Sequence, residues 1–453
     1  MKKVKAALVF LFTLVLVFTT TAMPASAAVK SAYKAKYPIV LVHGLAGFGE
    51  YDDINDIIQY WGYTSGSIDS YLESLGNECY EASVGPISSA WDRACELYAQ
   101  LTGTVTDYGA YHAAIHGHDR YGRDYTESGY GMLMDEEWSE SNPINLVAHS
   151  FGGVTCRTLI QLLEEGSAEE YAYAEENGEL DELSPLFEGG KKGWVYSLTN
   201  LAAPSNGSTV CEALPDVVHL VGDLMTAGSK ALSVTSLKGL YDFQLEHFGI
   251  TTKKTDSLDC VYARILASGF MNHNDNAFAD LALDKAIDMN ASLDLQDDVY
   301  YFSYYGDRTY KPLIGNYRPT LRMWAPFQIS GKAMCNYKGT TAGYYYDGYG
   351  YNKSKIYTTK TKTSSSTGWQ RNDGMVPVES GQWPFHYENG KRVDDAHVSA
   401  KVGVKATKTA TWYVMPAVDA DHLTFCGGVL NETVSGTRNL FKGIMSNIVN
   451  CGG

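Results

Sequence analysis

The hexapeptide Ala148-His-Ser-Phe-Gly-Gly153 places one serine between a histidine and a phenylalanine, with two glycines directly after them. A serine hydroxyl becomes a nucleophile when a neighbouring base takes its proton. The apolar run at 144–148 has the length of a buried strand, and residues 151–165 have helical periodicity. A serine between a strand and a helix is typical of a nucleophile elbow, here with Ala148 in place of the usual first glycine. The alternative is a serine that only caps the helix.

The small neighbours of Ser150 fit such a tight turn, because the residues two positions away, Ala148 and Gly152, have to be small. The backbone N–H of Phe151 would then point at a reacting carbonyl from the start of a helix, where unpaired N–H groups favour negative charge. A second N–H is needed to complete an oxyanion hole. Leu45, in the loop after the first apolar run, offers it, although that loop could also be an ordinary turn.

A base and an acid must follow, and this type of site has the chain order serine, acid, histidine. His422 comes directly after a late strand, whereas His386 and His397 lie in polar loop sequence. Asp373 stands just before an apolar pair and would orient His422 and stabilise its imidazolium form. Asn-Asp-Gly at 372–374 is also a common turn sequence, so spacing alone leaves the role of Asp373 open.

A second group of side chains is of the metal-binding type. Asp92 lies on a predicted helix, and His112 and His118 follow in a short stretch. The two histidines are six residues apart and cannot share one helix face, so a loop would have to bring them together. Carboxylate and imidazole ligands suit a four-coordinate zinc site. The alternative is a set of solvated surface groups.

These side chains need a scaffold, and apolar runs of strand length alternate with helical segments along the chain. The pattern predicts an α/β fold with a mainly parallel sheet and helices on both faces. The expected strands are residues 37–43, 78–83, 144–148, 194–201, 299–305 and 409–414, and the expected helices are 67–75, 88–101 and 151–165.

The first 27 residues have the pattern of a signal peptide. Three lysines precede the apolar run 6–18, and Ala25-Ser-Ala27 fits a cleavage site. The run is shorter than the ~20 residues of a membrane span, which is the alternative. We therefore expect export, with one domain over residues 28–453.

The composition excludes some partners and leaves the cysteines undecided. The chain has 453 residues and a net charge of −16, which argues against nucleic acid as a partner. Its 8 cysteines are too few for a disulfide scaffold of this length, and their pairing does not follow from their spacing.

Longer motifs carry a family resemblance. The sequence resembles the secreted, zinc-containing lipases of bacilli and staphylococci, which are α/β-hydrolases. The resemblance implies that Ser150, Asp373 and His422 form the catalytic triad of a triacylglycerol lipase. The matching stretches are residues 37–44, 84–96, 107–118, 148–153, 184–190, 315–317, 372–374 and 421–422.

The resemblance also implies a structural zinc ion held by Asp92, His112, His118 and Asp275, with His116 and Asp119 as local competitors. It places these ligands in an insertion at about 85–125 together with about 265–280. The family's calcium site does not carry over, since Thr424 and Arg322 stand at two of its positions. No calcium is therefore expected.

We interpret two further stretches from the resemblance or from their composition. The glycine-interrupted apolar stretch at about 214–240 is expected to be a helical lid over the site, the alternative being core helices. The Tyr-rich and Thr-rich stretch at about 342–367 is expected to be a surface excursion. The expected partner is a lipid ester at an oil–water interface. A carboxylesterase, a phospholipase and an inactive secreted binding protein that uses residues 342–367 remain as alternatives.

Overall fold

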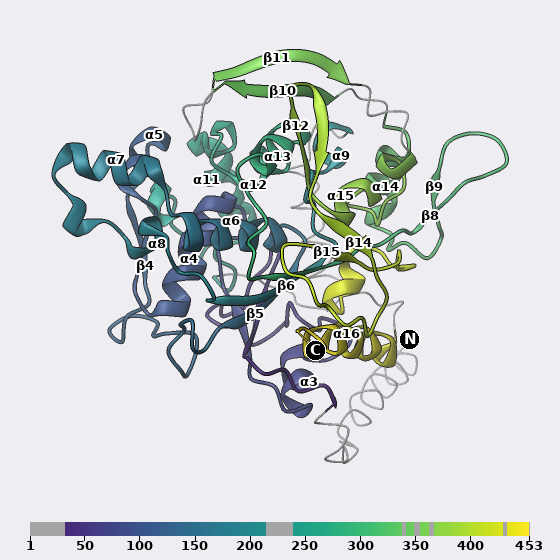
Figure 1. Cartoon of the computed structure of the whole chain (residues 1–453), viewed down its shortest axis with the longest axis horizontal. Coiled ribbons are helices and arrows are strands. Elements are labelled where there is room, and N and C mark those ends of the chain that lie inside the picture. Colours follow the sequence, from purple (N-terminus) through teal and green to yellow (C-terminus); the bar gives the residue numbers. More distant parts are fainter. Residues whose placement is uncertain are drawn as a thin grey trace, which may run out of the picture.

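A single parallel sheet forms the centre of the molecule (Figure 1). The computed structural model describes residues 32–213, 239–337, 341–347, 354–361, 367–428 and 433–452. Seven strands pair in the order β14-β15-β7-β6-β5-β1-β2, and all of these pairs are parallel. The strands are β1 (Ile39–Val42), β2 (Cys79–Ala82), β5 (Ile144–His149), β6 (Val195–Leu201), β7 (Tyr300–Tyr304), β14 (His397–Ser399) and β15 (Trp412–Val414).

Helices cover both faces of this sheet, as the continuous apolar runs of its strands require. In β1, Val40 and Val42 pack in one core cluster with side chains of α4 and α6. Ile39 and Leu41 point to the opposite face and pack in a second cluster with side chains of α3 and α16. The sheet is thus the middle layer of three, and the predicted α/β fold class is confirmed.

The three helices expected at 67–75, 88–101 and 151–165 are present as α3, α4 and α6, within two residues at each end. Ser67 and Ser89 cap α3 and α4, because each serine hydroxyl accepts a hydrogen bond from the N–H three residues on. The helices are α3 (Ile68–Ser74), α4 (Ala90–Thr102), α5 (Ala110–His116), α6 (Gly152–Glu165), α7 (Ala168–Asn177), α8 (Pro185–Glu188), α9 (Thr209–Ala213), α11 (Leu258–Ser268), α12 (Ala277–Leu281), α13 (Leu283–Asn290), α14 (Phe327–Cys335), α15 (Val378–Gln382) and α16 (Val434–Val449).

Several short antiparallel ribbons lie outside the sheet. The excursion expected at 342–367 contains a ribbon of β10 and β11 at the top of Figure 1 rather than only a loop. The pairs are β3 (Val105–Asp107) with β4 (Tyr121–Asp124), β8 (Thr309–Tyr310) with β9 (Arg318–Pro319), β10 (Thr341–Asp347) with β11 (Ser354–Thr361), and β12 (Phe385–Glu388) with β13 (Lys391–Asp394).

The signal peptide and nearly all of the lid expected at 214–240 lie outside the described residues. None of the helices among the described residues combines the length and the apolar character that crossing a bilayer requires. All eight cysteines lie in described segments, and all are free thiols.

Candidate functional site

Ser150 lies at the carboxyl end of β5, where the chain turns sharply into α6. Its φ is +55°, in the left-handed region that residues other than glycine rarely adopt. The N–H of Ser150 donates to the carbonyl of Leu201 at the end of the neighbouring strand β6, 2.8 Å away. This hydrogen bond helps to hold the strained turn, and the serine lies above the edge of the sheet.

The glycines after Ser150 allow α6 to pack directly against the ends of the strands. A Cβ on Gly152 would lie 2.5 Å from the carbonyl oxygen of Val42, and one on Gly153 would lie 2.6 Å from Cβ of Ala203. Neither distance can be tolerated against such fixed neighbours. The two glycines therefore place the start of α6, and with it Phe151, next to the loop that follows β1.

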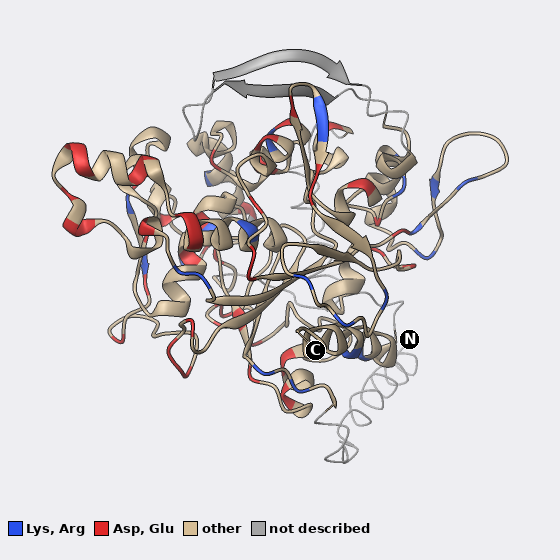
Figure 2. Ribbon diagram, viewed as in Figure 1, with Lys and Arg blue, Asp and Glu red and all other residues tan. Residues whose placement is uncertain are grey.

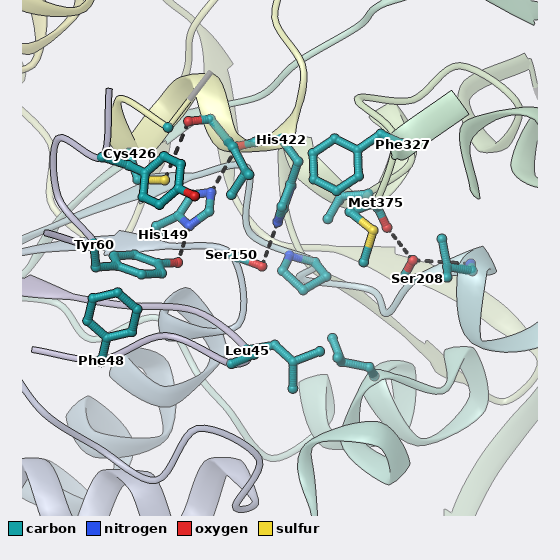
Figure 3. Close-up of a pocket in the computed structure, with 18 of the residues that line it drawn as sticks. Leu45, Phe48, Tyr60, His149, Ser150, Ser208, Phe327, Met375, His422 and Cys426 are labelled. Carbon is teal, nitrogen blue, oxygen red and sulfur yellow. Dashed lines mark hydrogen bonds between the residues drawn. The ribbon is translucent and has the colours of Figure 1, made fainter. Parts of the chain in front are cut away.

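His422 connects Ser150 to Asp373, and Figure 3 shows its contact with Ser150. Its Nε2 lies 2.8 Å from Ser150 Oγ, and its Nδ1 lies 2.9 Å from Asp373 Oδ2. The other oxygen of Asp373 accepts the N–H groups of Met375 and Val376. An ionised carboxylate only accepts, so Nδ1 carries the imidazole proton and Nε2 is free to take the serine proton.

The other two candidate histidines lie elsewhere. His397 stacks on Trp383 with 3.8 Å between the ring centres, and His386 pairs with Glu388. Neither forms a contact with Ser150 among the hydrogen bonds of the described residues.

The loop after β1 passes close to the serine. A Cβ on Gly44 would lie 2.6 Å from Cβ of Ser150 and 3.1 Å from its Oγ, so only glycine fits there. Leu45 follows and lines the same pocket as Ser150. Phe151, buried at the start of α6, is next to the serine on the other side. The two predicted oxyanion-hole residues thus both belong to segments that adjoin Ser150.

Tyr60 and His149, which the sequence analysis did not select, connect this loop to His422. His149 Nε2 lies 2.9 Å from the backbone carbonyl of His422, and its Nδ1 lies 2.6 Å from the Tyr60 hydroxyl. Burial lowers the pKa of His149 well below its usual value, so the ring is neutral. Because a carbonyl can only accept, Nε2 carries the proton and Nδ1 accepts from Tyr60. The Tyr60 hydroxyl in turn accepts the N–H of Gly44 at 2.9 Å.

A pocket opens over the serine, and its walls are mostly apolar (Figure 3). Leu45 and Phe48 contribute from the loop after β1, and Phe327 and Met375 come from the segments beside His422. Such a pocket offers an acyl chain a surface of its own polarity. Further apolar residues of the wall are Ile54, Ile58, Val210, Phe278, Leu281 and Trp324.

The four predicted metal ligands form one cluster. One ligand atom from each of Asp92, His112, His118 and Asp275 lies within 4.8 Å of all the others. His112 Nε2 lies 3.2 Å from both Asp92 Oδ1 and Asp275 Oδ2, and His118 Nε2 lies 3.3 Å from Asp275 Oδ2. Of the two competitors, His116 packs against the ring of His112 and Asp119 is exposed.

The surroundings of the cluster prepare these atoms to bind a cation. His118 Nδ1 donates to the carbonyl of Asp119 at 2.9 Å, which leaves a lone pair on Nε2 facing the cluster. Asp92 Oδ1 and His118 Nε2 are buried without a hydrogen-bond partner among the described residues. The carboxylates of Asp92 and Asp275 are both buried in this cluster. Two buried carboxylates therefore need positive charge here, and the donor set fits a divalent cation.

Neighbouring elements hold the ligands in place. Glu170 on α7 accepts the N–H of Tyr111 at 3.0 Å and of His112 at 2.7 Å, and so caps α5. His247, which the sequence analysis missed, lies 3.2 Å through Nε2 from Asp92 Oδ2. No spacing rule connects position 247 to position 92, so only the fold brings them together.

Known proteins of similar sequence and structure point to one family. A family model described as "Lipase-like, C-terminal domain" matches residues 35–342. A lipase of Staphylococcus epidermidis is 35% identical over 413 residues, which cover 90% of this chain and 52% of that protein. Lipase 1 of Staphylococcus aureus is 34% identical over 417 residues, with 90% and 53% covered. The chain thus spans about half the length of the curated relatives that it matches.

The chain belongs to this lipase family. Among solved structures, EstA of Clostridium botulinum is 32% identical with a TM-score of 0.71, and the match covers 90% of this chain and 87% of that one. Staphylococcus hyicus lipase is 28% identical with a TM-score of 0.69, and 90% and 94% are covered. These likenesses confirm the predicted family and the α/β-hydrolase fold.

In this member of the lipase family, a buried arginine supports the loop that carries His422. The guanidinium of Arg308 is fully buried, lies 3.6 Å from Asp421 Oδ2, and donates to the carbonyl of Asp419 at 2.9 Å and to that of Arg322 at 2.8 Å. Thr424 donates to Asp421 Oδ1 at 3.1 Å. This network joins the residues on both sides of His422 to the segment after β7.

Proposed function

We propose that the chain is a secreted lipase that hydrolyses the carboxylic esters of triacylglycerols. The observation that carries the proposal is the contact of Ser150 with His422, and of His422 with Asp373, at the base of an apolar pocket. The family relationship, with relatives named lipase, supports the same activity.

In the proposed mechanism, Ser150 Oγ attacks the ester carbonyl while His422 Nε2 takes its proton. Asp373 stabilises the imidazolium that forms. The backbone N–H groups of Leu45 and Phe151 stabilise the negative charge on the carbonyl oxygen. His422 then protonates the departing glycerol alkoxide, and water hydrolyses the acyl-enzyme by the same steps in reverse order. Each step is supported by the position of His422 between the other two side chains.

We infer that the cation held by Asp92, His112, His118 and Asp275 is zinc and that its role is structural. Imidazole and carboxylate ligands suit zinc, and four protein ligands leave no position open for a substrate. The ion would fix α4 and α5 to the segment before α12. We further propose that residues 1–27 are a signal peptide and that residues 28–453 form one domain.

The decisive experiment is fatty-acid release from emulsified triolein and tributyrin, with Ser150→Ala beside the wild type. The wild type is expected to release long-chain acid, and the variant is expected to lose at least about 10³-fold in rate, as removal of a nucleophile does. Cleavage of soluble short esters alone would mean a carboxylesterase. No cleavage of any ester by the wild type would refute the proposal.

A further inference from the structure

The ribbon of β8 and β9 projects from the body of the protein at the right of Figure 1. It has a defined position, because Asn316 Nδ2 donates to Oδ1 of Asn336 on α14 at 2.9 Å. Lys311 lies over the ring of Tyr317, with Nζ 4.8 Å from the ring centre. We call residues 309–322, which include this ribbon, the projecting hairpin.

The projecting hairpin exposes apolar side chains to an unusual degree. Leu313 is 106% exposed, Leu321 99% and Ile314 88%. These are the three most exposed large apolar side chains among the described residues, and the next, Ile329, is 66% exposed and lies on the adjoining α14. Single exposed apolar residues are ordinary, but a group of them on one projection marks a surface that contacts something else.

The charge of the projecting hairpin is opposite to that of the protein as a whole. It contains Lys311, Arg318 and Arg322 and no acidic residue, whereas the chain has a net charge of −16. Arg322, at its base, forms an ion pair with Asp419, so Lys311 and Arg318 carry the positive charge of its projecting part. In Figure 2 the hairpin carries blue segments and no red ones, while red segments are frequent on α7 and around it. Apolar side chains among basic ones fit the surface of a lipid layer with anionic headgroups.

The base of the projecting hairpin is joined to the candidate active site. Arg308 donates to the carbonyl of Arg322 at 2.8 Å, and its own carbonyl accepts the N–H of Thr320 at 2.8 Å. The same guanidinium holds the loop that carries His422. The chain after the hairpin leads within two residues to Trp324, which lines the pocket. A surface that binds the hairpin would therefore lie in a fixed relation to Ser150.

We propose that the projecting hairpin anchors the enzyme to anionic lipid layers: Leu313, Ile314 and Leu321 insert among the acyl chains, and Lys311 and Arg318 contact the headgroups. The proposal deepens the proposed function, on which it rests for the choice of lipid as partner. The hairpin would hold the pocket at the surface where the substrate is found.

The test measures binding to vesicles in the Ser150→Ala background, so that no lipid is hydrolysed. The vesicles are made of phosphatidylcholine with added phosphatidylglycerol. The fraction of protein that sediments with them is compared for the parent and for the double variant Leu313→Asp/Ile314→Asp. The double substitution is expected to weaken binding at least about tenfold, because two apolar insertions are replaced by charges that the headgroups repel. Lys311→Gln with Arg318→Gln is expected to weaken binding to these vesicles and to leave binding to pure phosphatidylcholine unchanged.

Leu180→Asp is the control, since Leu180 is also exposed but follows α7 in a segment that contains Glu179, Asp181 and Glu182. It is expected to bind vesicles as the parent does. Equal binding by the hairpin variant and its parent would overturn the proposal. So would gel filtration in which the parent is a dimer and the hairpin variant a monomer, because a second copy would then cover the hairpin.

The two proposals can fail separately. Hydrolysis of soluble p-nitrophenyl acetate, measured with Ser150 present, is expected to be unchanged by the hairpin substitutions, which also shows that the variant is folded. If the wild type cleaves no ester, the proposed activity fails while the vesicle measurement still decides the role of the hairpin.

Discussion

His149 and Tyr60 form hydrogen bonds that link the segments around Ser150. The imidazole of His149 links the carbonyl of His422 to the Tyr60 hydroxyl, which accepts the N–H of Gly44. One chain of hydrogen bonds thus joins the proposed base to the loop that carries Leu45. The histidine of the motif at 148–153, His149, therefore has a positional role, in contrast to that of His422.

We predict that Tyr60→Phe lowers kcat about tenfold on a soluble ester and leaves KM nearly unchanged. The substitution keeps the aromatic wall of the pocket but removes the partner of Gly44 N–H and of His149 Nδ1. A tenfold decrease corresponds to about 1.4 kcal/mol of lost transition-state stabilisation, which is within the range for the loss of a hydrogen-bonding group. Steady-state kinetics give the answer. Tyr71→Phe, at an exposed hydroxyl, is the control and is expected to behave as the wild type. An unchanged kcat for Tyr60→Phe would show that Tyr60 does not position the catalytic residues.

Some residues of the site could be predicted from the sequence, and others could not. Ser150, His422 and Asp373 were selected from local motifs and chain order, and the structure brings their side chains within hydrogen-bond distance. Tyr60 and Arg308 carry no local motif, and their partners lie far along the chain. Such residues become visible only when the folded chain places them beside the site.

At the scale of elements, the metal cluster depends on contacts between helices. Asp92 belongs to α4 and His112 to α5, and Glu170 on α7 accepts hydrogen bonds from the start of α5. Asp280 on α12 accepts the N–H of Ala90 at 2.8 Å and so holds the start of α4. The ion would therefore add a direct link between α4, the end of α5 and the segment before α12.

We predict that chelation lowers the stability of the protein and that Asp275→Asn does the same. At a free metal concentration about 100-fold above its Kd, the bound ion contributes about 3 kcal/mol. Thermal unfolding of the purified enzyme with and without chelator measures the loss, and elemental analysis is expected to find one zinc ion per chain. If chelation lowers the melting temperature of Asp275→Asn as much as that of the wild type, the cluster is not the site.

Most elements of the central sheet were predictable because their apolar runs are continuous and end at glycine or polar residues. The edge strand β14 was missed, since its three residues are exposed and contain no apolar run. The stretch expected as a surface excursion contains the paired strands β10 and β11. Its composition of tyrosine, glycine and threonine suits a turn-rich loop and a strand pair equally well.

At the scale of the whole molecule, the chain is acidic, and one of its carboxyl groups, that of Glu81, lies in the interior. This side chain on β2 is buried, and its Oε2 accepts from Asn55 at 2.9 Å. Burial raises the pKa of Glu81 to about 8, with further contributions from Asp69 and Glu50. The folded protein therefore keeps this carboxyl protonated at a pH at which the unfolded chain ionises it.

We predict that this carboxyl makes the wild type less stable as the pH rises. Its folded pKa of about 8 is above the ordinary value of 4.5. The contribution of this carboxyl to the free energy of unfolding is therefore fully present below about pH 4.5 and is lost as the pH rises through 8. The Gln side chain of Glu81→Gln is neutral at every pH. This variant is therefore expected to lose less unfolding free energy than the wild type between about pH 4.5 and pH 8, by a few kcal/mol at most.

Urea unfolding at pH 5 and pH 8.5 measures the difference between Glu81→Gln and the wild type. Glu78→Gln, at an exposed carboxyl in the same segment, is the control and is expected to follow the wild type. The same pH slope in Glu81→Gln as in the wild type would contradict the prediction.

If the chain is exported and binds a metal ion, as we propose, the metal cluster would constrain the order of events as it folds. Its ligands come from positions 92, 112, 118 and 275, so the site cannot be complete until much of the chain has left the membrane. If the ion is bound outside the cell, the supply of zinc in the medium then controls the yield of folded enzyme. Under the proposed function, the hydrolysis of lipid by the exported enzyme would then depend on trace metal in the surroundings of the cell.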